Sequence, residues 1–485
     1  LKSLFSIKIK SFSVSGVHVL DFLGSKELHI GKIKVKDADI DLLVNNSLKT
    51  DKPETTKGMA NIFSKKIKGA SIDEIILKNI NITVSDIQKE KEPFLKLNSL
   101  SVSVKGVNMD STTINNSIPA TYRSMTLQTR EFAYNAPEFY SIICSGLDFN
   151  MGDSTLTISE FLLKPKYSKA GFDKRTPYET DLFSIGTKAI IINRIGVLGS
   201  LSNKGLNIPL LEIINPDIDI YRNKRIADPP YKYKPLLVTL IKKIPIPILL
   251  DTLKIKNGNL VYGELHQHRD TPGEIEFSNL NINGYNITNR KEQIALRPDF
   301  RLDVNALLMG KAKLQVNFRF DQSKANDFFT VKGEMGRIDA TEINRISESM
   351  MMVKIKSGDI HKTSFRFTAN NDQSNGELIM DYEDLKIEVM KTDSMKSHKA
   401  LSAIANGVMN NNNIPGKKKY KTGLIHFSRD KNKAIPNYLW KSIQSGLVSI
   451  IAPMAESKDQ KKIQQAKKGH EKEMKKKKRK NKKGN

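Results

Sequence analysis

The sequence is poor in cysteine and in aromatic residues. Its 485 residues include one cysteine, Cys144, and one tryptophan, and aromatic residues make up 7%. A lone cysteine forms no disulfide within the chain and no thiolate metal site, so we expect Cys144 to be a small buried hydrophobe. Hydrophobic residues amount to 39%, below the usual ~45–50%, an average that also counts glycine. Length and composition predict an elongated array or two to three packed units.

Long apolar runs and catalytic motifs are also missing. The nearest approach to the ~18 apolar residues of a membrane-spanning helix is 235–250, which is interrupted by Lys242, Lys243, Pro245 and Pro247. No serine-hydrolase elbow, phosphate-binding loop, dinucleotide-binding loop or zinc-protease motif is present. We therefore expect a protein that is not an enzyme and that uses no cofactor.

Two histidines raise the question of a metal site. His266 and His268 lie near Glu264 and Asp270, a combination that could form a weak site. The same residues are typical of an exposed hairpin tip, which is the interpretation we favour. The sequence thus predicts no metal.

Positive charge is in excess. The net charge is +27, and residues 456–485 contain fourteen Lys or Arg against four acidic residues. Such a surface attracts phosphate, either in anionic lipid headgroups or in nucleic acid. Aromatic residues that stack on bases are missing near this tail, so we expect no specific nucleic-acid partner. A disordered, solvated tail without a specific partner is the alternative.

The strongest positive signal is period-two alternation of apolar and polar residues. It predicts on the order of twenty strands, each with one apolar and one mostly basic face. Turn sequences rich in Asn, Gly and Asp, such as 256–259 and 356–359, predict hairpins in an antiparallel meander. A degenerate repeat, in which apolar-x-apolar is followed by a Lys-Asn-like pair, begins at Ile33, Ile75, Leu211 and Leu253.

Helical spacing is confined to a few segments. We expect helices at 236–244, 340–352, 396–409 and 435–451. The last of these has an apolar face that could lie on a membrane or cap the end of a sheet, and that contains Leu439, Trp440, Ile443 and Leu447. Two prolines after Asp228 suggest a boundary. The predicted regions are 1–228 and 229–395 (β-groove), 396–455 (amphipathic helical cap with a strand) and 456–485 (disordered lysine-rich tail).

Several segments resemble the AsmA-like family of bacterial envelope proteins. The resemblance is carried by residues 253–262, 277–282 and 329–390. In the first of these, Leu253-Lys254-Ile255-Lys256-Asn257-Gly258 is similar to a recurring unit of the family. It is strongest over residues 250–450, and the first 230 residues fit only by their strand pattern. The family's membrane anchor is not seen here, the chain is short for a full bridge, and the lysine tail is not a family hallmark.

The resemblance implies a mainly β fold: an elongated, curved antiparallel sheet of meandering strands that forms an open groove, with a few short amphipathic helices. It also implies a periplasmic protein, anchored in the inner membrane by a segment preceding Leu1, along which phospholipid acyl chains move between inner and outer membrane. The expected partners are phospholipids, anionic headgroups at a membrane surface, and envelope proteins.

The side chains expected to line the groove are the inward apolar residues of the best strands. They are Ile255, Leu260, Leu280, Ile282, Leu314, Val316, Phe318, Phe320, Phe365, Phe367, Leu385 and Ile387. The same pattern fits the core of a closed sandwich, since both structures bury every second residue. Two functional alternatives also stay open: an assembly factor for outer-membrane proteins that carries no lipid, and a basic β-protein that binds nucleic acid or glycan.

Overall fold

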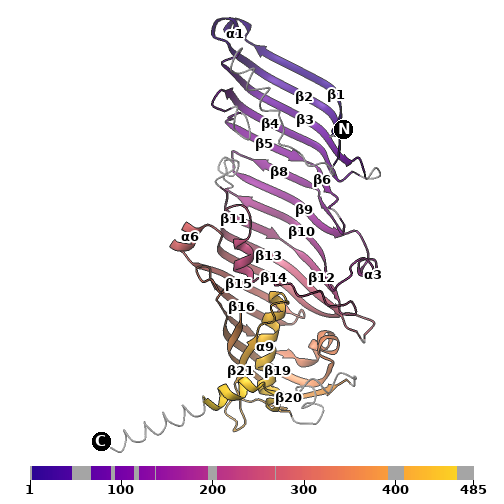
Figure 1. Ribbon diagram of the computed structural model, residues 1–485, viewed down its shortest axis with the longest axis vertical. Helices are drawn as coiled ribbons and strands as arrows, with labels where there is room; N and C mark the ends of the chain where they lie inside the picture. Colours follow the sequence, from indigo (N-terminus) through magenta and orange to yellow (C-terminus); the bar gives the residue numbers. More distant parts are fainter. Residues whose placement is uncertain are drawn as a thin grey trace, which may run out of the picture. The chain divides into compact units, whose positions relative to one another are not determined.

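The protein is mainly β, as predicted. The computed structural model describes residues 3–45, 67–88, 93–113, 120–136, 138–194, 205–267, 269–390 and 409–466. Its 21 described strands belong to one sheet (Figure 1). The chain divides into two compact units: unit 1 comprises Leu1–Phe172, Leu182–Ile218 and Ile246–Lys256, and unit 2 comprises Asp173–Asp181, Asp219–Pro245 and Asn257–Asn485. The boundary predicted near Asp228 stays a prediction.

Unit 1 consists almost entirely of strands. Its elements are β1 (Ser3–Val17), α1 (Val19–Ser25), β2 (Glu27–Val44), β3 (Gly69–Asp86), β4 (Leu95–Asp110), β5 (Ser124–Thr129), β6 (Glu131–Tyr134), β7 (Tyr140–Cys144), β8 (Gly146–Asn150), β9 (Thr155–Pro165), α3 (Lys169–Asp173), β10 (Asp181–Asn193), β11 (Leu206–Ile214) and the first half of β13 (Ile248–Leu265). Figure 1 shows β1 to β4 side by side, with α1 at one end. Cys144 is buried as expected, and burial raises the pKa of its thiol.

Unit 2 contains strands and most of the described helices. Its elements are β12 (Asp217–Asn223), α5 (Leu237–Lys242), the second half of β13, β14 (Gly273–Thr288), α6 (Lys291–Leu296), β15 (Asp299–Leu308), β16 (Ala312–Asp321), β17 (Phe329–Met335), β18 (Ile338–Asp339), η1 (Ala340–Ile343), α7 (Asn344–Ile346), η2 (Ser347–Met351), β19 (Val353–Ala369), β20 (Gln373–Val389), β21 (Gly423–Ser428), α9 (Ile435–Ile451) and η4 (Pro453–Ala455).

In three of the four copies of the repeat the Lys-Asn-like pair is a bulge inside a long strand, so its interpretation as a hairpin turn was wrong. In the copy that begins at Leu211, Asn215 and Pro216 separate β11 from β12. β13 runs without a break from Ile248 to Leu265 through Asn257, which has φ 52°. Likewise, β19 runs through Gly358, with register shifts against β20 on either side. The positive φ was predicted correctly, but a single left-handed residue is also what a bulge requires. The turn expected at 371–376 is a hairpin, but it is shorter than predicted: it spans 370–372, because residues 373–376 already belong to β20.

The repeat explains why two strand pairs depart from the antiparallel meander. β2 and β3 are parallel, and so are β11 and β13. Each pair sets two copies of the repeat in equivalent register, with Ile33 opposite Ile75 and Leu211 opposite Leu253. The fifth residue of every copy has positive φ: Asp37, Asn79, Asn215 and Asn257. In the first pair, the Asn79 amide donates a 2.7 Å hydrogen bond to the Asp37 carboxylate.

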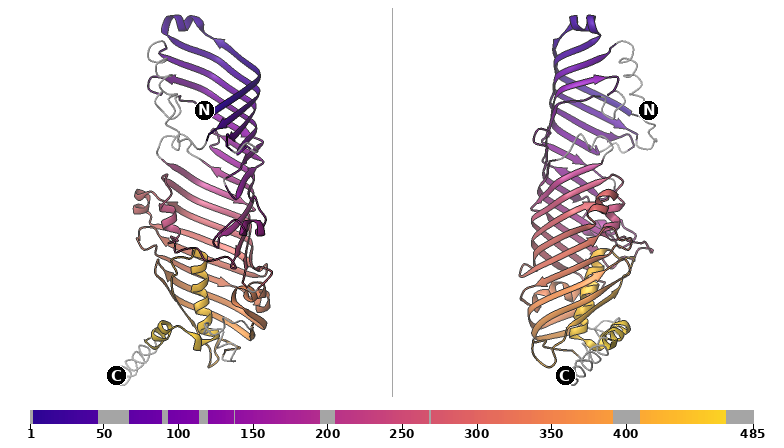
Figure 2. Two further views of the ribbon diagram at one scale, coloured as in Figure 1. Left: turned by 45° about the vertical axis from the view of Figure 1, so that its right-hand side comes forward. Right: turned by 90° about the vertical axis from the view of Figure 1, so that its left-hand side faces the viewer.

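Helix α9 packs on the sheet of unit 2 through small residues. Figure 2 shows this yellow helix against the orange strands from two directions. Its backbone approaches so closely that a Cβ at Gly423 would lie 2.2 Å from the carbonyl oxygen of Gly446. The hydroxyls of Ser445 and Ser449 accept hydrogen bonds of 3.1 Å from backbone N–H groups of β21. Small side chains thus let the helix satisfy the outer donors of the last described strand.

The other predicted helices have different outcomes. Leu237–Lys242 is helical as expected, and 340–352 forms a 3₁₀, α and π succession in place of one regular helix. The segment 396–408 lies outside the described residues, as does the tail beyond 466. Residues 458–466 of that tail are helical. Among the described helices, none combines the length and the apolar character needed to cross a bilayer.

Candidate functional site

An uninterrupted apolar row crosses ten strands of unit 1. It follows from the pairing of each strand with the next, in the order β1, β2, β3, β4, β5, β8, β9, β10, β11 and β13. The side chains in directly opposed positions are Phe12, Val35, Leu77, Val102, Leu127, Phe149, Leu156, Ile192, Leu211 and Leu253. Not one of the ten is polar. We call this surface, with the parallel rows two residues away, the open apolar face.

The neighbouring row, one residue along each strand, has the opposite character. Because successive side chains point to opposite sides of a sheet, this row belongs to the other face. Over the same ten strands, eight of its ten members are polar: the row contains Ser13, Lys34, Ile76, Ser103, Thr126, Asn150, Thr155, Asn193, Leu210 and Thr252. The sheet of unit 1 therefore has one apolar and one predominantly polar face.

The open apolar face keeps part of its surface accessible. In the ten-residue row only Phe149 is buried; Phe12 is exposed and the remaining eight are half-buried. The helices described in unit 1, α1 and α3, have seven and five residues. At 1.5 Å per residue they are too short to cover ten strands. Apolar surface left accessible on this scale is characteristic of a binding surface.

Eleven of the twelve predicted groove residues lie in unit 2, where six of them are buried. Ile255 alone belongs to unit 1, opposite Ile213 on the open apolar face. In unit 2 the buried members are Leu280, Val316, Phe320, Phe365, Phe367 and Leu385, and the half-buried ones are Leu260, Ile282, Leu314, Phe318 and Ile387. These strands therefore provide a packed core more than an accessible groove.

The helical cover explains this burial. α9 contacts β20 and β21 on the side to which Leu378 and Ile425 point, and both of those side chains are fully buried. Tyr438 of α9 packs against Phe329, with ring centroids 6.4 Å apart. Phe329 in turn stacks on Phe320 at 5.3 Å. The helix thus closes part of the face that the sequence pattern predicted to be open.

The predicted membrane-facing residues of α9 are only partly accessible. The side chains buried against β20 and β21 are Tyr438, Ser442, Gly446, Ser449 and Ile450. Leu439, Trp440, Ile443 and Leu447 are half-buried. The helical spacing of small residues at 442, 446 and 449 marks the packing face, whereas the prediction rested on the large apolar residues. A membrane contact of these four residues stays a prediction.

The polar face of unit 1 carries a cluster of lysines. Lys36 lies directly opposite Lys78, and Lys34 is two residues away on β2. The neighbouring ammonium group of Lys36 lowers the pKa of Lys34, with Lys32 and Lys78 contributing. Lys32 is neutralised by Glu74 at 2.8 Å. Directly opposed like charges destabilise a strand pair, so this face is suited to an anionic surface.

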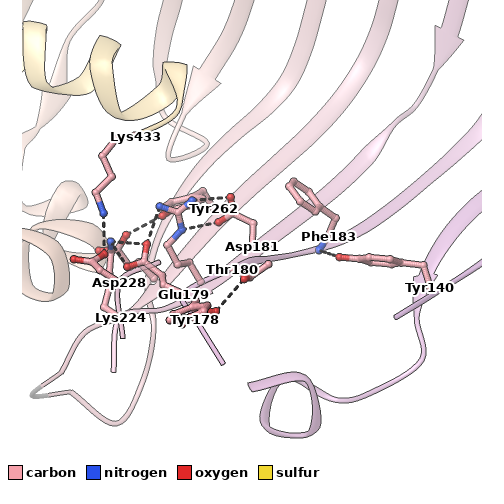
Figure 3. Close-up of polar contacts among 12 residues, drawn as sticks. Tyr140, Tyr178, Glu179, Thr180, Asp181, Phe183, Lys224, Asp228, Tyr262 and Lys433 are labelled. Carbon is pink, nitrogen blue, oxygen red and sulfur yellow. Dashed lines mark hydrogen bonds and ion pairs between the residues drawn. The ribbon is translucent and has the colours of Figure 1, made fainter. Parts of the chain in front are cut away.

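A network of ion pairs lies in unit 2, between the start of β10, strands β12 and β13, and the segment before α9 (Figure 3). Arg222 forms a bidentate pair with Asp181, with both N–O distances 2.6 Å, and lies 3.2 Å from Glu179. Lys224 binds Glu179 at 2.7 Å. Although burial alone would lower the pKa of Arg222, the hydrogen bonds and charge of Asp181 raise it. Each of these carboxylates is thus engaged by a cation.

The same network ties the segment before α9 to the rest of unit 2. Lys433 pairs with Asp228 at 2.9 Å. The backbone N–H of Lys234 donates to the carbonyl of Lys431 at 2.8 Å, and Arg429 binds the carbonyl of Lys234. Tyr262 donates a 2.8 Å hydrogen bond to Glu264, and burial raises the pKa of this phenol. The arrangement is that of a structural clamp.

Metal binding at the two histidines is not supported by the described residues. His268 lies outside them, and the carboxylate of Glu264 accepts the hydrogen bond from Tyr262. Within the described ranges, no group of three or more His, Cys, Asp or Glu side chains is placed to hold a metal ion.

No protein-family model matches the chain, and a search of curated proteins finds no match.

Proposed function

We propose that this chain is an AsmA-like envelope protein that shields phospholipid acyl chains on the open apolar face of unit 1. The observation that carries the proposal is the row of ten apolar side chains across ten strands. Transfer of an acyl chain from water to such a face gains ~0.8 kcal/mol for each buried CH₂ group. A long, unreactive ligand needs continuous apolar surface and no reacting group.

The proposal also covers the location of the protein and the membranes between which the lipid moves. In this proposal the protein is periplasmic and is anchored in the inner membrane by a segment before Leu1. Its open apolar face would conduct phospholipids between the inner and the outer membrane. The lysine cluster around Lys34 and Lys36 on the opposite face would favour anionic headgroups nearby. Because α9 covers part of the apolar core of unit 2, we place lipid in unit 1.

Charging the open apolar face is expected to remove bound lipid. The double variant Leu77→Asp with Val102→Asp places two carboxylates at opposed positions of β3 and β4. The matched control, Ile76→Asp with Ser103→Asp, places the same charges on the same two strands but on the polar face. Phospholipid per purified chain is measured by native mass spectrometry, with circular dichroism as the test of folding.

We expect the phospholipid content of the Leu77/Val102 variant to fall at least about tenfold, which corresponds to ~1.4 kcal/mol in binding free energy. The control should retain its phospholipid. Equal retention in both variants would show that lipid does not occupy this face. Wild-type protein that is folded and free of lipid would favour the assembly-factor alternative.

A further inference from the structure

Helix α1 carries an exposed aliphatic surface at the junction of β1 and β2. Val19, Leu20 and Leu23 are 58%, 84% and 73% exposed. Their i, i+1 and i+4 spacing places them on one side of this short helix. A single exposed leucine is ordinary on a protein surface, but three large aliphatic side chains within five residues are not.

We call α1 with its flanking residues His18 and Lys26 the tip. The backbone of the tip is hydrogen-bonded at both of its ends. The N–H of His18 donates to the carbonyl of His29 at 3.0 Å, and the N–H of Lys26 donates to the carbonyl of Phe22 at 3.0 Å. The carbonyl of Lys26 accepts from the N–H of Lys68 at 2.9 Å. Paired backbone groups lower the desolvation penalty of moving the tip out of water.

The aliphatic surface of the tip continues along the chain into the open apolar face. Val17, the last residue of β1, is exposed, and Val14 lies opposite Ile33 on that face. The large side chains that α1 exposes are aliphatic, without the Tyr, Trp and Arg that dominate protein–protein hot spots. The composition and the continuity both favour a lipid phase over a folded protein partner.

We infer that α1 inserts Val19, Leu20 and Leu23 into the interfacial region of a phospholipid bilayer, from which acyl chains reach the open apolar face. The inference names the partner of the proposed function and rests on it. An aliphatic tip that enters the boundary between headgroups and acyl chains is how interfacial segments hold a protein to a bilayer without crossing it.

Tryptophan fluorescence tests the insertion. In the full chain, Trp440→Phe removes the single tryptophan, and Leu20→Trp then places a reporter on α1. The matched control is Leu296→Trp, because Leu296 of α6 is 79% exposed on unit 2. Each protein is mixed with phosphatidylcholine vesicles, with and without brominated acyl chains.

We expect a blue shift of about 10 nm and at least about twofold quenching by brominated lipid at position 20, and neither at position 296. The same quenching should persist when Leu77→Asp and Val102→Asp are added, because insertion of α1 does not require an occupied face. Absence of the shift at position 20, equal signals at both positions, or loss of quenching in the added variant would overturn the inference. If only the proposed function is wrong, the quenching at position 20 remains. The Leu77→Asp, Val102→Asp variant then keeps the phospholipid content of the wild-type protein.

Discussion

Replacement of Phe367 by aspartate is expected to unfold unit 2. Phe367 is 1% exposed, stands opposite Val331 on β17, and has its ring centroid 6.3 Å from that of Phe365. Removing a buried aromatic ring costs about 3–5 kcal/mol, and an unpaired buried carboxylate adds several more. We expect a loss of at least about 5 kcal/mol in the free energy of unfolding.

Urea titration followed by the fluorescence of Trp440, the single tryptophan and a residue of α9, measures this change in unit 2. Arg366→Asp is the matched control, because Arg366 is the exposed neighbour on the opposite side of β19. The control should shift the midpoint only slightly. A Phe367→Asp protein with a wild-type midpoint would mean that this face of unit 2 is accessible and not a core.

The second large effect is expected at the ion-pair network. The side chain of Arg222 is 14% exposed, and Arg222→Leu would leave Asp181 without its bidentate partner and Glu179 with Lys224 alone. Breaking a buried ion pair from one side costs about 3–5 kcal/mol, because the remaining charge stays buried. We expect this loss in the same urea titration.

Arg225→Leu provides the matched comparison. Arg225 is more exposed and pairs at 3.0 Å with Asp270, which is fully solvent-accessible. Exposed pairs contribute at most about 1 kcal/mol. Adding Asp181→Asn to Arg222→Leu should recover part of the stability, because it removes the uncompensated charge. Equal losses for Arg222→Leu and Arg225→Leu would contradict the assignment of the network as a clamp.

The strand content was predictable because each strand has an apolar and a polar side. Alternation around Val316 and Phe318 predicts β16, and the repeat beginning at Ile33 correctly marks positions of special backbone conformation. The geometry at those positions was not predictable, because one left-handed Asn or Asp satisfies either a hairpin or a bulge. Pairing with a neighbouring strand decides between them.

The accessible part of the apolar surface was not predictable either. The regular alternation at Phe365 and Phe367 predicts that both side chains share one side, but not that α9 covers it. In contrast, the half-buried row through Leu77 and Val102 became visible only when ten strands were placed in register. A single sequence specifies the apolar positions of each strand, whereas their accessibility depends on elements distant in the chain.

Site-specific photocrosslinking tests the central claim, the occupation of the open apolar face by acyl chains, most directly. Benzoylphenylalanine is introduced singly at Leu77, at its opposite-face neighbour Ile76, and at Phe320 in the core of unit 2. After irradiation, phospholipid adducts are measured by mass spectrometry of the purified chain. We predict adducts at position 77 and none above background at 76 or 320. Equal yields at 76 and 77, or adducts confined to 320, would contradict the account.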